Sequence, residues 1–205
     1  MDASKFKAPY LRKEEIWDRV DKLRKEASFG QSFPIDVLGM AEFDLGLELV
    51  PAYGLRQQCD TEAILLGDLK TILVDKESFT NSRQEYRLRF SVAHEIGHLI
   101  LHGDVYQNIR PPTADTWVSF ISELPDDQYN YLEYHANEFA GRLLVPRDRL
   151  EASLDEALQL AKSRGIKDWN ETTLSYLATY ISKSFNVSSE VISRRLRIEK
   201  LWPLS

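Results

Sequence analysis

The sequence predicts an α+β fold that is mainly helical, with a small, largely antiparallel sheet of three strands and a helical region at the C-terminal end. Three observations predict it. Apolar residues recur at spacings of three and four over most of the chain, which is typical of helices with one buried face. Three short apolar runs lie close together between residues 47 and 75. With 205 residues, 43% of them hydrophobic, the chain can form a good core without disulfides.

The first third of the chain is expected to form two helices and then the three strands. The apolar positions of the first helix are Ile16, Trp17, Val20, Leu23 and Ala27, and a shorter helix runs from Asp36 to Phe43. The strands are expected at Leu47–Tyr53, Glu62–Leu66 and Thr71–Asp75. Gly67–Lys70 has the residues of a tight turn, so the last two strands are predicted to form a hairpin.

The next predicted helix carries the most informative motif of the chain. Ser82–Glu85 has the pattern of a capping box, and an apolar stripe follows at Leu88, Val92, Ala93, Ile96, Leu99 and Ile100. His94 and His98 are four residues apart, so both imidazoles lie on one face of the helix and can bind one metal ion. Gly97 costs about 1 kcal/mol relative to alanine in a helix. It is either simply tolerated there or indicates that another backbone passes close to this face.

Glu95 lies between these two histidines, where its carboxylate can reach a water on the open side of the metal. Zinc lowers the pKa of its water towards about 7 and polarises a carbonyl group, so this carboxylate can act as a general base at neutral pH. The arrangement favours peptide hydrolysis. The alternative is a pair of ordinary core or surface histidines, but the chain has only 4 histidines and two of them fall in this frame.

A catalytic zinc ion usually takes three protein ligands, and three residues are candidates for the third. Asp104 lies six residues after His98, the spacing of a metzincin ligand, but that pattern needs a glycine where this chain has Leu101. His102 lies about 12 Å along the helix axis from His94, too far to join that pair, so it is interpreted as a helix-end residue or as a residue that orients a ligand.

The third candidate, Glu133, lies on a second helix predicted from Tyr129 to Val145 and ended by Pro146. Asn137 follows one turn later on the same face, where it can form a hydrogen bond with a ligating group and orient it. Two imidazoles, one carboxylate and an open position fit Zn²⁺ best, although the same ligand types also allow Mn²⁺.

Two segments resemble the ImmA/IrrE family of bacterial metallopeptidases: Arg89–His102, which reads RFSVAHEIGHLILH, and Glu133–Pro146, which reads EYHANEFAGRLLVP. The resemblance implies a zincin-like fold and cleavage of a cytoplasmic regulator, commonly a helix-turn-helix repressor of a stress-response, mobile-element or toxin–antitoxin operon. The chain departs from the common pattern at His135 and Gly141, away from the proposed ligands. By this resemblance the zinc ligands are His94, His98 and Glu133, and the catalytic acid/base is Glu95.

The C-terminal region predicts a helix that stops at Gly165, a second helix capped by Asn170, and a last helix after a tight turn at 185–188. We therefore expect a zincin-like metallopeptidase domain at 1–165 and a helix-turn-helix-like pair at 166–205 that packs on it. The last piece carries the basic residues Arg194, Arg195, Arg197 and Lys200.

These basic residues raise a second hypothesis, a DNA-binding transcriptional regulator with a structural metal site, in which the last helix enters the major groove. The plainer interpretation is a helical pair that supports the peptidase or docks its substrate. Glu95 distinguishes the two hypotheses, because a structural zinc site has four closed protein ligands and no use for a base. The oxyanion of a peptidase also needs a donor, for which Tyr106, Tyr129, Tyr131, Tyr134 and Arg142 are candidates.

The charge and composition of the chain limit the partners and the compartment that are expected for either function. The net charge is −6, so attraction of the whole surface to nucleic acid is not expected, and any contact with DNA must be local. Cys59 is the single cysteine, which excludes an intramolecular disulfide and favours a reducing compartment. Because the sequence has neither a leader-like start nor a run of about 18 apolar residues, we expect a cytoplasmic protein that does not bind membranes. The sequence leaves the oligomeric state open.

Overall fold

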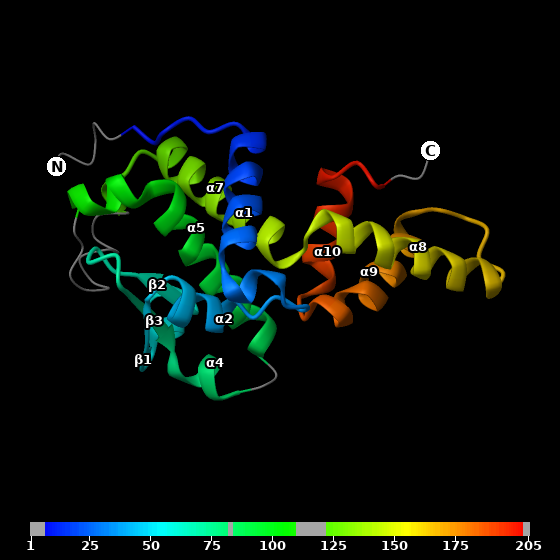
Figure 1. The fold of residues 1–205 in the computed structure, drawn as a ribbon, viewed down its shortest axis with the longest axis horizontal. Helices are drawn as coiled ribbons and strands as arrows, with labels where there is room; N and C mark the ends of the chain where they lie inside the picture. The colour runs from blue at the N-terminus through cyan, green and yellow to red at the C-terminus, as the bar shows by residue number, and fades with distance from the viewer. Residues whose placement is uncertain (1–6, 82–83, 110–121, 203–205) are drawn as a thin grey trace.

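The computed structural model describes residues 7–81, 84–109 and 122–202, which are mainly helical with one three-stranded sheet (Figure 1). This confirms the predicted fold class, while the predicted capping box includes residues 82 and 83, outside the described ranges. Among the described helices, none is long and apolar enough to cross a membrane. The elements are α1 (Lys13–Glu26), a 3-10 turn (Ser28–Gln31), α2 (Val37–Gly39), a π-helical turn (Met40–Asp44), β1 (Glu48–Ala52), α3 (Leu55–Cys59), β2 (Ala63–Leu65), β3 (Thr71–Asp75), α4 (Lys76–Thr80), α5 (Glu85–Ile109), α7 (Asp126–Leu144), α8 (Arg147–Ser163), α9 (Glu171–Phe185) and α10 (Ser189–Ile198).

The sheet has the strand order β1-β3-β2, so the last strand in sequence is the central one. β2 and β3 form the predicted antiparallel hairpin, with Ile64 opposite Leu73. β1 instead runs parallel to β3, with Val50 opposite Leu73. The prediction of a largely antiparallel sheet is therefore wrong for one of the two strand pairs. The chain reverses direction between successive strands, and because β1 pairs with the third strand and not with the second, the two partners run the same way.

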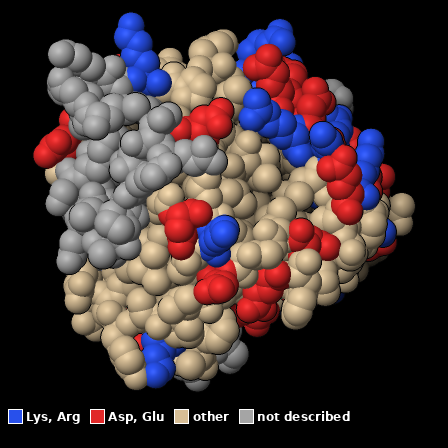
Figure 2. Space-filling model, turned by 60° about the vertical axis from the view of Figure 1, so that its left-hand side comes forward, with Lys and Arg blue, Asp and Glu red and all other residues tan. Residues whose placement is uncertain are grey.

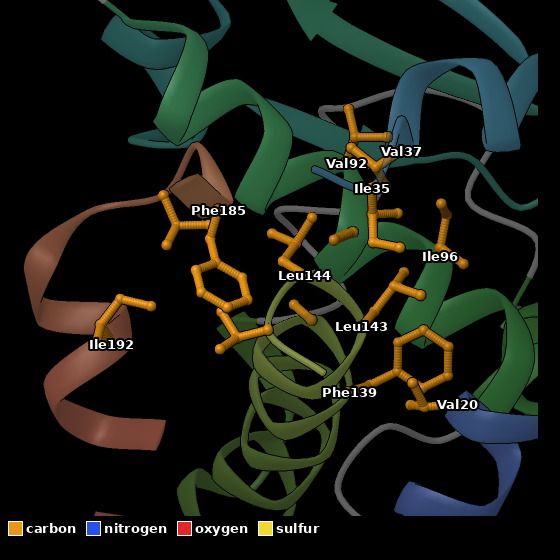
Figure 3. Packing of buried hydrophobic residues seen from close by; sticks show 14 of the residues in the cluster. Val20, Ile35, Val37, Val92, Ile96, Phe139, Leu143, Leu144, Phe185 and Ile192 are labelled. Carbon is orange, nitrogen blue, oxygen red and sulfur yellow. The ribbon is translucent and has the colours of Figure 1, made fainter. Parts of the chain in front are cut away.

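Helices α5 and α7 pack closely against each other at the centre of the fold. A Cβ atom on Gly97 of α5 would lie 3.1 Å from the Cβ of Phe139 and 3.2 Å from the Cα of Ala136, both on α7. The close approach of another backbone is thus confirmed, and that backbone is α7. Figure 3 shows Phe139 beside Val20 of α1, in the cluster that Ile96 of α5 also joins. This packing fixes the spacing between the two helices that bear the predicted ligands.

Helices α9 and α10 share the same hydrophobic core. Phe185 and Ile192 are fully buried and belong to the cluster that contains Leu144 of α7 (Figure 3). The side chain of Asn170 caps α9, as predicted, and that of Ser188 caps α10 after the predicted turn; both accept hydrogen bonds from backbone N–H groups. The division of the chain at residue 165 stays a prediction, and the core extends across that point.

Arg89 of α5 fastens the turn between α9 and α10 to the rest of the fold. Its buried guanidinium donates from Nε to the carbonyl of Asn186 at 3.2 Å and from Nη2 to the carbonyl of Ile35 at 2.7 Å. Asn186 itself has φ +54° and donates from its side chain to Glu85. The helix that carries the histidine motif therefore also supports the C-terminal helical pair.

Candidate metal centre and cleft

Three side chains converge between α5 and α7. His94 and His98 lie one turn apart on α5, and their Nε2 atoms are 2.9 Å apart. Glu133 of α7 faces both, with its Oε2 3.3 Å from Nε2 of His94 and its Oε1 3.4 Å from Nε2 of His98. Donors bound to zinc at about 2.0–2.1 Å in a tetrahedral arrangement lie about 3.3–3.4 Å from one another. The three side chains thus offer donors of the right kind, at nearly the right separations, for a zinc ion.

Glu95 is held by the sheet and stands beside this set. Its Oε2 accepts a hydrogen bond of 2.8 Å from the backbone N–H of Leu65, the last residue of β2. One carboxylate oxygen of Glu95 also lies within 4.8 Å of ring nitrogens of His94 and His98. Because the carboxylate of Glu133 faces both imidazoles directly, the geometry favours Glu133 as the third ligand and leaves Glu95 in the position of a base.

Burial and neighbouring charges both shift the pKa values of Glu95, Glu133 and His94. Burial raises the pKa of the Glu95 carboxyl. At Glu133 burial acts in the same direction, but hydrogen bonds with His94 and His98 outweigh it and hold the pKa well below its ordinary value. At His94 burial is the largest single effect and lowers the pKa, but the hydrogen bonds with Glu133 and Asn137 and the charges of Glu95 and Glu133 together outweigh it, so the pKa is raised. With neutral imidazoles the two carboxylates make the site anionic, a state that a bound cation relieves.

A row of imidazoles continues behind the site. Nδ1 of His98 lies 3.1 Å from Nδ1 of His102, and Nε2 of His102 lies 3.2 Å from Nδ1 of His135 on α7. Burial, with the charges of His98 and His135, lowers the pKa of His102 to about 2, so this ring is neutral. Histidines that bind a metal commonly use their second ring nitrogen in a hydrogen bond that fixes the ring. His102 is placed to do this for His98, whereas Asp104 is exposed on the far side of a kink in α5.

A cavity of about 560 Å³ opens over the converging side chains. Its walls come from α5, from α7, from the edge strand β2, and from α3 with the loop that follows. The α3 wall was not predicted, because Gln57 and Gln58 belong to no motif and lie far from the histidines in sequence. Besides His94, Glu95, His98 and Glu133, the cavity is lined by Gln57, Gln58, Asp60, Thr61, Ala63, Ile64, Phe90, Ser91, Tyr106, Tyr129 and Asn137.

Comparison with known protein families decides which group the chain resembles. Residues 79–197 match the IrrE N-terminal-like domain family, Peptidase_M78, which covers more than half of the chain. The chain belongs to this family. The matched segment contains α5 and α7, and therefore every proposed ligand, which confirms the resemblance inferred from the two motifs and supports a metallopeptidase. No curated protein matches the chain.

Within this IrrE-like chain, the cavity reduces the number of candidate oxyanion donors. Tyr106 and Tyr129 line it, whereas Tyr131, Tyr134 and Arg142 do not. Burial raises the pKa of Tyr129 to about 12, so its hydroxyl keeps the proton it would donate. The guanidinium of Arg142 instead forms ion pairs with Asp21 of α1, at 2.7 Å, and with Glu199, which follows α10, at 2.8 Å.

Two of the four basic residues expected to reach DNA, Arg195 and Arg197, form ion pairs within the protein. Arg195 is only 2% exposed, and its Nη1 lies 2.6 Å from Oε1 of Glu138 while its Nη2 pairs with Glu199. Arg197 pairs with Glu171 of α9. On the face drawn in Figure 2, lysine and arginine side chains lie among acidic ones and form no continuous basic surface. α10 thus differs from the basic recognition helix that the second hypothesis requires.

Proposed function

We propose that this protein is a zinc-dependent endopeptidase in which His94, His98 and Glu133 hold the ion and Glu95 is the catalytic acid/base. The observation that carries the proposal is the convergence of two imidazoles and the Glu133 carboxylate across α5 and α7, with Glu95 held separately by β2. Membership of the IrrE-like peptidase family supports it. A structural zinc site would instead need four protein ligands and would leave Glu95 without a function.

The proposed reaction assigns one task to each side chain. Zinc, when bound, polarises the scissile carbonyl and lowers the pKa of the attacking water. Glu95 takes the proton of that water and returns it to the leaving nitrogen of the peptide. The hydroxyl of Tyr106 or Tyr129 donates a hydrogen bond to the oxygen on which negative charge develops. Asn137 keeps the imidazole of His94 in its ligating orientation.

The edge strand β2 is the proposed binding site for an extended substrate. Leu66 and Glu62, which flank β2, form backbone hydrogen bonds with the β3 side of the hairpin. In an antiparallel pair such residues alternate with residues whose backbone groups face away, so the backbone groups of Ala63 and Leu65 point to the outer edge of β2. On that edge the N–H of Leu65 already donates to Glu95 and the carbonyl of Ala63 accepts from Thr61, so a substrate would use the other two backbone groups. A polypeptide can add its own backbone hydrogen bonds there. We propose, from the family resemblance, that the substrate is a cytoplasmic regulator such as a helix-turn-helix repressor.

The test combines a metal measurement with a cleavage assay. The purified protein is analysed for bound metal and incubated with the repressor encoded beside its gene, and then with a proteome digest. Glu95→Gln should keep the metal and lose cleavage by about 10²–10⁴-fold, because the carboxylate base is removed and the ligands stay. Glu85→Gln, on the exposed start of the same helix, is the matched control. Stoichiometric zinc without any Glu95-dependent cleavage of either substrate would refute the proposal.

A further inference from the structure

A second cavity, of about 550 Å³, adjoins the cavity over the proposed metal site. Four residues line both: Asp60, Phe90, Ser91 and Asn137. The residues before β2 lead from one to the other, because Ala63 lines the first cavity and Glu62 lines the second. The two cavities therefore form one groove, which begins over the proposed metal ligands and continues past the start of β2.

The far wall of this groove is α10, the second helix of the C-terminal pair. Ser188, Glu190, Val191 and Arg194 line it, facing Tyr86, Arg87 and Phe90 of α5. Val191 and Phe90 are partly buried, pack against the main hydrophobic cluster and give the groove an apolar lining. A substrate that extends out of the proposed active site along β2 would thus meet the C-terminal helical pair.

Some of the charged residues that line the groove form ion pairs with one another, and others do not. Arg56 and Arg87 both lie within 4.0 Å of Glu62, at 3.9 and 3.8 Å. Arg194 is exposed, and among the described residues no carboxylate lies within ion-pair distance of it. Glu190 lies one turn before it on α10, so the groove carries charges of both signs. An arginine in a groove suits a substrate carboxylate, which it can bind in a bidentate manner.

We propose that this groove is a substrate-binding subsite of the peptidase, in which Phe90 and Val191 accept an apolar side chain and Arg194 selects an acidic residue beside it. The occupant is the substrate polypeptide itself, since the groove is continuous with the proposed catalytic cavity. The inference rests on the proposed endopeptidase function. It gives α10 a role in choosing the protein to be cut, in place of DNA recognition.

The test profiles cleavage of a mixed-sequence peptide library by the zinc-loaded protein, with products identified by mass spectrometry. We expect the wild type to prefer aspartate and glutamate over lysine and arginine at one position by about two- to fivefold, the range of an exposed ion pair. Arg194→Glu should reverse this preference at that same position. The matched control is Arg197→Glu, which makes the same charge change on the same helix outside the groove and should leave the profile as in wild type.

The outcomes separate the inference from the function on which it rests. Equal profiles for wild type and Arg194→Glu would overturn the subsite while leaving the peptidase in place. The same change in Arg197→Glu would also overturn it, because the effect would then be one of total charge. If the wild type cleaves no peptide in a Glu95-dependent manner, the proposed function fails, and the subsite fails with it. Thermal unfolding of each variant shows whether the fold is kept.

Discussion

Replacing Gly97 by alanine tests whether the spacing between α5 and α7 sets the affinity for metal. The added Cβ would lie 3.1 Å from the Cβ of Phe139 and 3.2 and 3.3 Å from the Cα and carbonyl oxygen of Ala136. Carbon atoms in contact are about 3.5–4.0 Å apart, so α7 must move by about 0.4 Å. Such overpacking costs about 1–3 kcal/mol, and the higher helix propensity of alanine offsets about 1 kcal/mol of it. A net loss of about 1 kcal/mol lowers Tm by about 2–4 °C.

The same displacement carries Glu133 away from the two imidazoles, because Glu133 lies one turn before Ala136 on α7. We therefore expect the zinc affinity of Gly97→Ala to fall about tenfold, as measured by competition with a chromophoric chelator. Gly103→Ala is the control on the same helix, because among the described residues its Cβ would meet only the Cδ1 of Leu69, at an ordinary 3.8 Å. Wild-type zinc affinity in Gly97→Ala, together with a Tm at or above that of Gly103→Ala, would refute this reasoning.

Three further predictions concern a metal ligand, the ion pairs of α10 and the cap of α4. Glu133→Ala should lose stoichiometric zinc in a metal analysis while Asp104→Ala keeps it, and the reverse result would contradict the ligand assignment. Arg195→Ala should lower the free energy of unfolding by about 3–5 kcal/mol in urea, because it leaves the buried carboxylate of Glu138 without its cation, while Glu199 keeps Arg142 and Arg147. Arg197→Ala should cost at most about 1 kcal/mol. Asp75 caps α4, and although burial raises its pKa, hydrogen bonds from the first turn of that helix and from the backbone N–H of Arg56 together outweigh this and lower it. Its contribution is present above the unfolded pKa of about 3.9 and is lost as the pH falls through the lower folded value, so the stability gap between wild type and Asp75→Ala should narrow in acid urea titrations.

Local patterns predicted most of the helices and strands, because each depends on neighbours in sequence. The period of the apolar residues placed α7 within three residues of its observed bounds, and Asn170 marked the start of α9 through its capping side chain. α5 instead continues to Ile109, past His102, where a helix end was expected and the structure has a kink. The strand order was not predictable in this way. Pairing of β1 with β3 depends on where the chain returns after α3, and no local pattern encodes that choice.

The candidate site shows the same contrast between features that local sequence patterns predict and features that depend on distant residues. The ligand set could be predicted because His94 and His98 share one helix face and Glu133 belongs to a second distinctive motif. The groove could not, since its walls combine α3, β2 and α10, which lie far apart in sequence. The burial of Arg195 in an ion pair was also not predictable from sequence. Its partner Glu138 is 57 residues away, and charged residues of amphipathic helices usually lie on the exposed face.

The hydrogen bond from Leu65 to Glu95 decides which oxygen of the carboxylate takes part in proton transfer. With Oε2 occupied by a backbone N–H, Oε1 is the oxygen left to exchange protons. In the proposed reaction a single oxygen therefore both receives the proton from water and delivers it to the leaving nitrogen. The water and the leaving nitrogen must therefore both come within hydrogen-bond distance of that one oxygen, so the strand proposed to align the substrate also fixes where the proton is transferred.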